Sequence, residues 1–534
     1  MVWQPNLLRF WREAQSCATF RFPAFLGALL VLGVAIRAMQ NPMDPDSWWH
    51  VAVGERILQD GSFPETDTFS FTAAGTSWIA YEWLGEVLMA SAAKMWGFRG
   101  HSFVLLLTSS LLFLLLYYYA YLRSRNWKAA FAACTVVLPL AGIFFTLRPQ
   151  LLGYSLLVLT LICLERFRQG NERAIWALPF IFLVWVNTHG SFAFGLFVVG
   201  LYWTCGLVRF QWGGLSGEKW TDRQRLCLEI SMLLSVAGLC VTPYGTRLAA
   251  YPFELALLQP ANVANIVEWQ PLTTNLSFGK FFVGLLLLYF LAQTVARQTY
   301  QLHELALLFF SVFSASLHRR FLIIFVIMFA PLLAALLARW FAPYDPAKDR
   351  PLLNGALVVA MLAALFWIFP SEGALQEQAA NSYPQRAVQY LQDHPIEGSL
   401  WNEYGWGGYL IWARHPKHRV FIDGRADIYE YSGILSDYLR IDRLHPDALS
   451  LLRKYDIRAS LVRRNSPLGT LLRTAPGWSP VYADKVSELL VFQVPAPALE
   501  IPSLAASPSK EFPASAALLP QSELRQAHFE TVPN

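Results

Sequence analysis

Two aspartates and a histidine lie close together in the segment Asn41-Pro-Met-Asp-Pro-Asp-Ser-Trp-Trp-His50, which follows the first long apolar stretch. Carboxylates in such a loop bind a divalent cation, or act as a general base on an acceptor hydroxyl or amide. Because side chains two residues apart point to opposite sides of an extended chain, Asp44 and Asp46 need a turn to share one ligand. The alternative is a solvated turn that caps a helix. We favour a chemical role over a purely structural one. Asp44, Asp46 and His50 are candidate catalytic residues, and Asp46 is a candidate ligand of Mg²⁺ or Mn²⁺.

Two surface helices are predicted around this segment. With Ser47 as the expected N-cap, apolar residues recur at helical spacing over residues 48–58. Residues 78–96 predict a second helix, in which Glu82, Glu86 and Lys94 suit a helix on the membrane surface better than a span. Aromatic residues beside an apolar stretch are typical of the membrane interface. Both helices are therefore predicted to lie over the outer ends of membrane spans.

The composition excludes an ordinary soluble enzyme. Of the 534 residues, 55% are hydrophobic and 15% are charged, and the mean hydropathy is +0.36. These values indicate a polytopic α-helical membrane protein, and nothing in the sequence indicates nucleic-acid binding. Eleven segments are expected to span the bilayer: residues 23–39, 101–122, 129–147, 150–164, 175–186, 191–208, 226–241, 278–296, 302–316, 321–338 and 352–369.

The distribution of Lys and Arg between these segments sets the predicted orientation. With eleven spans, the basic residues of 123–128, 166–173, 209–225 and 339–350 all lie on the cytoplasmic side, as the positive-inside rule requires. The N-terminus is then inside, in the cytoplasmic (inner) membrane, and residues 41–100 form a long outer loop. Residues 1–372 are predicted to be the membrane domain and 373–494 an extracytoplasmic α/β domain. The Pro-, Ala- and Ser-rich tail of 495–534 is predicted to be disordered.

Polar residues of the membrane domain gather on the predicted outer side. Arg148, His318, Arg319 and Arg320 are candidates for binding the phosphate of a lipid carrier, because guanidinium pairs bidentately with phosphate. The alternative for these cations is contact with lipid headgroups. Glu82, Asn187, His189 and Glu268 are candidates for binding the acceptor or substrate. For His189 and Glu268 a purely structural role is the alternative.

The α/β domain contains two further candidate sites. In Trp401-Asn-Glu-Tyr-Gly405 and the glycines after it, the backbone is expected to approach a ligand closely, with Glu403 and Tyr404 in contact. Asp423, Arg425 and Asp427 lie at the end of a predicted buried strand at 419–423, where α/β domains often carry functional side chains. A tight turn held by an Asp423–Arg425 ion pair is the alternative.

The layout of one anchor, a long acidic first outer loop, many spans and a C-terminal outer domain resembles the GT-C superfamily of membrane glycosyltransferases. Asp44-Pro-Asp46-Ser-Trp-Trp-His50 is similar to the first-loop aspartate motif of the oligosaccharyltransferase catalytic subunit. In that subunit, an acidic residue of the motif helps to hold a divalent metal and the acceptor. Trp401-Asn-Glu-Tyr-Gly405 is similar to its Trp-Trp-Asp-Tyr-Gly motif, with Asn402 and Glu403 in place of Trp and Asp.

The resemblance implies an enzyme that transfers a hexosyl or pentosyl group from a polyprenyl-phosphate-linked donor to an extracytoplasmic glycan, lipid or protein. A first alternative is en bloc transfer of an oligosaccharide to protein. Two non-enzymatic alternatives are a transporter of a lipid-linked solute and a scaffold of envelope assembly. A transporter would place ionisable residues at mid-membrane, often within inverted repeats, whereas here they gather at one face.

Overall fold

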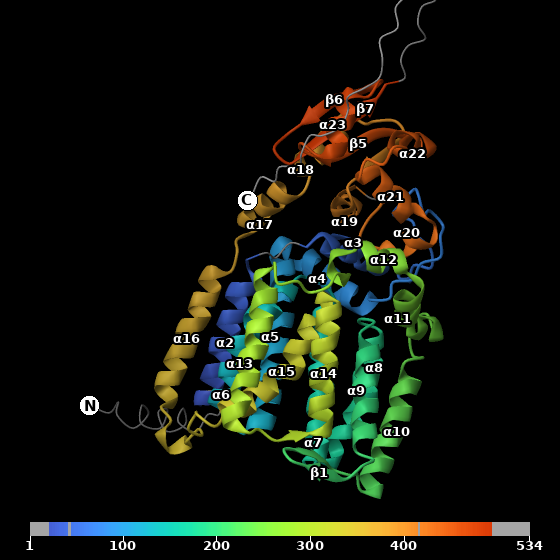
Figure 1. Ribbon diagram of the computed structural model, residues 1–534. Helices are drawn as coiled ribbons and strands as arrows, with labels where there is room; N and C mark the ends of the chain where they lie inside the picture. Colours follow the sequence, from blue (N-terminus) through green and yellow to red (C-terminus); the bar gives the residue numbers. More distant parts are fainter. Residues whose placement is uncertain (1–20, 41–43, 415–416, 494–534) are drawn as a thin grey trace, which may run out of the picture. The chain divides into compact units, whose positions relative to one another are not determined.

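The computed structural model describes residues 21–40, 44–414 and 417–493 of the chain, so the predicted disordered tail lies outside the described residues. The structure is largely helical, with small sheets (Figure 1). Six helical segments of the described residues are long and apolar enough to cross a membrane. These are α5 (Phe98–Ser124), α6 (Trp127–Ala141) extended by η2 (Gly142–Phe144), α7 (Gln150–Arg168), α13 (Ser277–Ala296), α15 (Leu322–Leu337) preceded by η5 (Arg319–Phe321), and α16 (Pro351–Ile368). The chain is therefore an integral membrane protein.

Helices also occupy the remaining expected spans. Three shorter apolar helices are α2 (Phe22–Ala38), α9 (Phe192–Cys205) and α14 (Leu302–Leu317). The last two expected spans correspond to α8 (Leu178–Val186), which follows η3 (Glu172–Ala177), and α10 (Asp222–Gly238). The count of eleven spans and their orientation stay predictions, because length and composition alone select six.

Helix α15 lies at the centre of the helical part. Its sequence is apolar throughout, and its side chains are almost all buried. It packs against α5, α6 and α14, which Figure 1 shows beside it. A helix that is apolar on every face is stable only when other helices cover it, so α15 anchors the core of the helical part.

The first loop forms the two predicted helices, α3 (Pro45–Asp60) and α4 (Trp83–Trp96). Helix α4 packs on α3 and α5 and is not among the candidate spans in the described part of the chain. The two helices touch at Gly54, where a Cβ atom would lie 2.1 Å from the carbonyl oxygen of Glu86. Only glycine permits this close approach.

The predicted N-cap of α3 is wrong. The cap is Asp44, whose Oδ1 accepts the backbone N–H of Asp46 at 3.0 Å. Pro45 at the first helical position is preorganised for this start, because its φ angle is fixed and its missing N–H needs no partner. Ser47 instead donates its hydroxyl to the carbonyl of Leu147 at 2.7 Å. The helix therefore begins before Ser47 and holds both aspartates in its first turn.

The C-terminal part contains a four-stranded sheet in the order β4 (Ser399–Asn402), β5 (Ile457–Arg463), β7 (Ser487–Phe492), β6 (Trp478–Ala483). Strands β4 and β5 are parallel, and the other neighbours are antiparallel. The helices of this part are α17 (Glu372–Ser382), α18 (Gln385–Asp393), α19 (Tyr404–Arg414), α20 (Ala426–Tyr431), α21 (Ile434–Asp442), α22 (Ala448–Lys454) and α23 (Pro467–Thr474). The predicted mixture of helices and strands is present, whereas the domain boundaries stay predictions.

One predicted strand of this part is wrong. Residues 419–423 do not join the four-stranded sheet. Val420 instead forms an isolated parallel bridge with Ser70 of the first loop. The apolar side chains of Val420 and Phe421 are buried because the first loop covers them, so their apolar character does not require a sheet.

Smaller elements connect these parts. A second sheet is formed by β1 (Phe210–Trp212), β2 (Leu215–Gly217) and β3 (Tyr300–Gln301). Between α10 and α13 the chain forms α11 (Thr246–Leu258), α12 (Pro260–Asn265) and η4 (Val267–Trp269), and η6 (Pro346–Lys348) precedes α16.

The first loop and the C-terminal part share one hydrophobic core. Trp48 of α3 is fully buried and makes edge-on ring contacts with Tyr383 and Tyr409, with ring centroids 5.4 Å and 5.3 Å apart. Helix α19 packs directly on α3. A Cβ atom at Gly408 would lie 2.6 Å from the carbonyl oxygen of Pro45. The start of α3, which carries the aspartates, is therefore held by the C-terminal part.

The predicted topology can be tested by labelling single cysteines introduced into a cysteine-free variant. Cysteines at Gly75 and Asp437 should react with a membrane-impermeant reagent in intact cells, because both positions lie on the predicted outer side. A cysteine at Gly217 should react only after the membrane is opened. Labelling of Gly217 from outside would contradict the orientation.

Candidate active site

The structure contains a cavity of about 520 Å³ where the first loop, the short connections between helices and the C-terminal part meet. Most of the predicted site residues line it: Asp46, His50, Glu82, Arg148, His189, Glu268, Arg320 and Tyr404. They come from α3, from the residue before α4, from the connections around α7, α8 and α9, from η4 and η5, and from the start of α19. The predicted gathering of polar residues at one face therefore corresponds to a single cavity.

Arg148 lies at the centre of a cluster of carboxylates. Its Nε donates to Asp44 Oδ1 at 2.8 Å and its Nη2 donates to Asp44 Oδ2 at 3.1 Å. Nη2 also lies 3.0 Å from Asp46 Oδ2, and Nη1 donates to Glu268 Oε1 at 3.1 Å. The first turn of α3 supplies the turn that the spacing of Asp44 and Asp46 requires. One guanidinium thus neutralises part of the charge of three carboxylates.

Burial and these contacts set the protonation states of the cluster. Burial opposes the charge of Arg148, but the carboxylates of Asp44 and Asp46 outweigh it and raise the pKa of Arg148 well above its ordinary value. Burial raises the pKa of Asp46 to about 7, although the charge of Arg148 opposes this shift. The charge of Arg148 lowers the pKa of Glu268. Arg148 is therefore always cationic, whereas Asp46 titrates near neutral pH.

The donor set around Asp46 does not fit a metal ion while Arg148 keeps its place. The guanidinium lies between Asp44, Asp46 and Glu268, where a divalent cation would need to be. Within residues 21–40, 44–414 and 417–493, no group of three or more His, Cys, Asp or Glu side chains is arranged to hold a metal. A metal at Asp46 stays a prediction, and no step described below uses one.

The three cations after α14 differ in their surroundings. Arg320 lines the cavity, and its guanidinium carbon lies 4.0 Å from the ring centroid of Trp269. It forms no hydrogen bond or ion pair with any residue that the structure describes. Arg319 is partly exposed and donates to the carbonyl of Val267, and His318 Nδ1 donates to the carbonyl of Trp269. Arg320 is thus the member of the pair that faces the cavity, a point the sequence leaves open.

Two histidines flank Glu82 on the opposite wall. His50 Nε2 lies 3.5 Å from Glu82 Oε2, and His189 Nε2 lies 3.3 Å from Glu82 Oε1. Behind His50, its Nδ1 lies 3.0 Å from Oε1 of Glu86, which is fully buried in α4. The sequence identified Glu86 only as part of a surface helix. Its spacing of four residues from Glu82 was the available signal, because that spacing places both on one helix face.

Burial shifts the pKa values of the two glutamates, Glu82 and Glu86, and of the two histidines, His50 and His189. It raises the pKa of Glu82 to about 8, with the charge of Arg148 opposing the shift, and raises the pKa of Glu86 well above its ordinary value. It also lowers the pKa of His50 well below its ordinary value and that of His189 to about 3. Both imidazoles are therefore neutral at physiological pH.

Asn187 is buried and has structural partners. Its Oδ1 accepts the indole N–H of Trp83 at 2.8 Å, and its amide donates to the carbonyls of Leu183 and Val241 at 2.8 Å and 3.1 Å. These bonds tie the start of α4 to the end of α8. Asn187 does not line the cavity, and its predicted contact with a substrate stays a prediction.

A third wall of the cavity combines Asp427, a residue that the sequence places after the predicted strand, with two tyrosines that no sequence pattern identified. The ring of Tyr81 stacks on that of Tyr251, with centroids 4.3 Å apart. The hydroxyl of Tyr251 donates to Asp427 Oδ2 at 2.6 Å, and Asp427 and Tyr81 both line the cavity. A carboxylate beside an aromatic face suits a polyhydroxylated ring, because hydroxyl groups donate to the carboxylate while C–H groups pack on the ring face.

The C-terminal candidates divide into two groups. Tyr404 lines the cavity and donates its hydroxyl to the carbonyl of Gly424 at 3.2 Å. Glu403 instead forms an ion pair with Arg463 Nε. Asp423 and Arg425 are fully buried and do not line the cavity. Binding of a substrate by Glu403, Asp423 and Arg425 stays a prediction.

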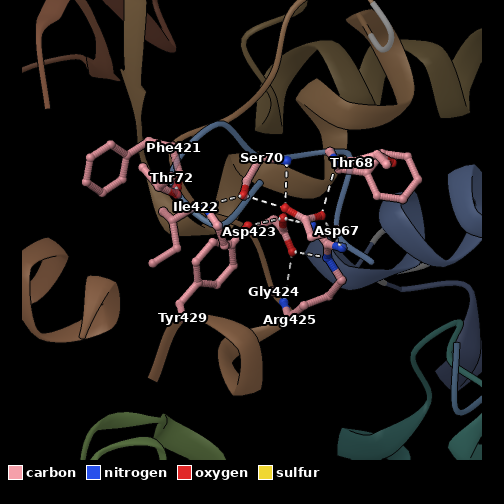
Figure 2. A network of polar contacts seen from close by, with 12 residues as sticks. Asp67, Thr68, Ser70, Thr72, Phe421, Ile422, Asp423, Gly424, Arg425 and Tyr429 are labelled. Atoms are coloured by element: carbon pink, nitrogen blue, oxygen red, sulfur yellow. Dashed lines mark hydrogen bonds and ion pairs between the residues drawn. The ribbon is translucent and has the colours of Figure 1, made fainter. Parts of the chain in front are cut away.

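Figure 2 shows that Asp423 and Arg425 form an ion pair, which is the alternative to a ligand-binding role that the sequence left open. Arg425 Nη2 lies 2.7 Å from Asp423 Oδ2, and its Nη1 lies 2.8 Å from Oδ1 of Asp67 in the first loop. The hydroxyls of Tyr429 and Ser70 donate to Asp423 and Asp67. One buried guanidinium thus joins the C-terminal part to the first loop through two carboxylates.

Comparison with known proteins was informative only for structure. No protein family and no curated protein matches the sequence. The fold is similar to that of the oligosaccharyltransferase AglB from Archaeoglobus fulgidus in complex with an inhibitory peptide and a dolichol-phosphate. The TM-score is 0.50 at 12% identity, covering 89% of this chain and 74% of AglB.

Two further solved structures match less well. The Archaeoglobus fulgidus oligosaccharyltransferase tethered with an acceptor peptide gives a TM-score of 0.47 at 12% identity, covering 88% of this chain and 74% of that one. ArnT from Cupriavidus metallidurans bound to undecaprenyl phosphate gives a TM-score of 0.45 at 13% identity, covering 86% of this chain and 97% of that one. At this identity the likeness concerns the fold. The chain has a GT-C-like fold, and the predicted resemblance to that superfamily is confirmed.

The buried junction at Arg425 can be tested through stability. Replacing Arg425 with Met should lower the free energy of unfolding by about 3–5 kcal/mol, because two carboxylates remain buried without a counter-ion. Arg463→Met is the matched control, since the side chain of Arg463 is exposed and Glu403 keeps the backbone N–H of residue 463 as a partner, so the loss should be less than about 1 kcal/mol. Denaturant unfolding in detergent measures both. Equal, small losses would show that the Arg425 network does not stabilise the fold.

Proposed function

We propose that this protein is a GT-C-type glycosyltransferase that moves a sugar from a polyprenyl-phosphate-linked donor to an extracytoplasmic acceptor. The observation that carries the proposal is the cavity itself. It combines the guanidinium of Arg320, which forms no direct ion pair with a described residue, with carboxylates at Asp46 and Glu82, and it lies at the ends of apolar helices. Such a site suits a substrate with a phosphate at the junction of a lipid and a sugar.

Arg320 is the best candidate for binding the donor phosphate. Its charge is not used in an ion pair with a described residue, and stacking on Trp269 orients it. Arg148 stays cationic and adds positive potential nearby, but its N–H groups already bind three carboxylates of the protein. A cation beside the leaving phosphate stabilises the negative charge that develops as the glycosidic bond breaks.

Asp46 is the best candidate for orienting the acceptor. It lines the cavity beside Arg148, whereas Asp44 lies behind it as the helix cap. A carboxylate there accepts a hydrogen bond from an acceptor hydroxyl or amide and directs its lone pair at the sugar carbon. Correct placement of the two reactants accounts for much of the rate of such a reaction.

Support for a lipid-linked donor also comes from the fold. The AglB structure contains a dolichol-phosphate and an inhibitory peptide, so a fold of this kind accommodates both a polyprenyl phosphate and a peptide. En bloc transfer of an oligosaccharide to protein is therefore the second candidate. Mass spectrometry of envelope glycans and glycolipids from a deletion strain distinguishes the two, because each predicts loss of a different product.

The two neighbouring arginines provide a matched test of the donor site. Arg320→Gln should raise the apparent KM for the donor at least tenfold, because it removes a phosphate contact from the cavity. Arg319→Gln should stay within about twofold of the parental protein, because Arg319 bonds only to a backbone carbonyl. Transfer to the product identified in the deletion strain is measured in membranes. Equal effects of both changes would contradict this assignment.

The acceptor site can be tested with Asp46→Asn. The amide keeps size and hydrogen bonding, and Arg148 retains Asp44 and Glu268, so the protein should fold and insert normally. The transfer rate should fall by roughly a hundredfold, because the acceptor loses its orienting charge. The rate is measured at saturating donor in well-expressed protein. If the variant retained the parental rate, the acidic motif would serve only as a cap and an anchor for Arg148.

A further inference from the structure

Two groups of carboxylates face the cavity, and they have different partners. Asp44, Asp46 and Glu268 share the guanidinium of Arg148. Glu82 and Glu86 form no ion pair with Arg or Lys in the described part of the chain, and their neighbours are the imidazoles of His50 and His189. A carboxylate whose nearest polar neighbours are neutral holds a proton more readily than one in direct contact with a fixed positive charge.

Hydrogen bonds assign the tautomer of His189. Its Nδ1 accepts the backbone N–H of Ser191 at 3.0 Å. Because His189 is neutral, its single ring proton is then on Nε2, which lies 3.3 Å from Glu82 Oε1. His189 therefore presents an N–H group to Glu82.

His50 is oriented by Glu86. Oε2 of Glu86 is fully buried and has no hydrogen-bond partner among the residues that the structure describes, while Oε1 lies 3.0 Å from His50 Nδ1. A buried carboxylate oxygen without a partner is far less costly when the group is neutral. A protonated Glu86 donates to Nδ1, which places the ring proton of His50 on Nε2, 3.5 Å from Glu82 Oε2. Both histidines then present an N–H group to Glu82.

We infer that Glu82 is the general base that takes the acceptor's proton, and that Glu86 is a protonated positioning residue acting through His50. This inference rests on the proposed function. Glu82 lines the cavity, so it reaches the acceptor directly, whereas Glu86 lies behind His50. The two N–H groups hold the carboxylate in place and stabilise it when it is charged.

The transfer of the sugar and of the acceptor's proton needs no group beyond the donor, the acceptor, Glu82 and Arg320. The acceptor oxygen or nitrogen forms a bond to the anomeric carbon of the sugar as the bond from that carbon to the phosphate oxygen breaks. The electron pair of the broken bond stays on the phosphate, beside Arg320, and polyprenyl phosphate leaves. The acceptor's proton moves to Glu82, from which solvent in the cavity removes it before the next turnover.

Tight packing fixes the base relative to the cluster of Arg148. A Cβ atom at Gly85 would lie 2.6 Å from Cβ of Pro149, the residue after Arg148. At Gly54, one turn after His50, a Cβ atom would meet the backbone of Glu86. These two glycines allow α4 to approach α3 and the start of α7, and so bring Glu82 and Glu86 to their histidines.

The pH dependence follows from the groups that face Glu82. They are His50 and Asp46 of α3, Glu86 of α4, His189 of the α8–α9 connection, Arg148, Arg320 and Asp427 of α20. Burial dominates and raises the pKa of Glu82 to about 8. A general base acts only when ionised, so the transfer rate should rise about tenfold per pH unit between about pH 7 and about pH 8 and then become constant. Below about pH 7 the rise should be steeper, because Asp46 is then protonated as well.

The test is the pH profile of single-turnover transfer at saturating donor by purified full-length protein. Glu82→Gln should lower the rate by roughly a hundredfold or more and abolish the rise toward pH 8, while donor binding is unchanged. Asp46→Asn should be slow but keep that rise. Glu65→Gln, an exposed carboxylate of the same loop, is the matched control and should behave as the parental protein.

The positioning role of Glu86 is tested in the same assay. Glu86→Leu should shift the pH profile, because His50 loses the donor that sets its tautomer. Glu86→Gln should restore most of the parental profile, because its amide also donates to Nδ1. If Glu82→Gln does not fold, Glu82→Asp, which withdraws the carboxylate from the histidines, takes its place and should also lose the rise.

Two outcomes separate the inference from the proposed function. A parental protein with no transfer of any sugar would overturn the proposed function. Parental rates and an unchanged pH profile in Glu82→Gln would overturn only the role of Glu82. Infrared difference spectra provide a readout without turnover: a carboxylic acid band should titrate near pH 8 and be absent from Glu82→Gln. A band that does not titrate, or that persists in the variant, would overturn the assignment.

Discussion

The buried charge of Arg148 is the constraint on which the site depends. Removing a guanidinium from water costs several kcal/mol unless carboxylates of good geometry surround it, and here Asp44, Asp46 and Glu268 do so. Arg148 lies before α7, and its partners come from the start of α3 and from η4, so the ion cluster joins three separate segments at one point. The cavity exists because these segments cannot move independently.

The first loop is held from two directions. Below it, α4 packs on α3 and α5. Above it, Trp48 packs on Tyr383 and Tyr409 and Arg425 binds Asp67, so the C-terminal part completes the core of the loop. A short amphipathic helix is marginal in isolation and becomes stable by burying its apolar face. The loop that carries the chemistry is thus ordered by tertiary contacts on both sides.

The cavity is divided electrostatically. On one wall, the permanent cation Arg148 binds three carboxylates, and its charge lowers the pKa of Glu268. On the other wall, Glu82 faces two neutral histidines, and burial raises its pKa. Groups whose environments move their pKa values apart serve different chemical roles at the same pH. The separation matches the needs of a transfer reaction, in which one region stabilises a leaving anion and another receives a proton.

Sequence by itself determined the membrane class, the helical segments, the two helices of the first loop and most of the charged and histidine side chains of the cavity, because hydrophobic periodicity and misplaced charges are local signals. Tertiary structure decided the rest. Asp44 and Arg148 meet although they are 104 residues apart, and only the folded chain shows that Arg320, not Arg319, faces the cavity. The segment 419–423 pairs with the first loop instead of the sheet, and Glu86 reaches His50 only because Gly54 permits close helix packing. Such contacts depend on the distance between surfaces that are remote in sequence, which no local pattern encodes.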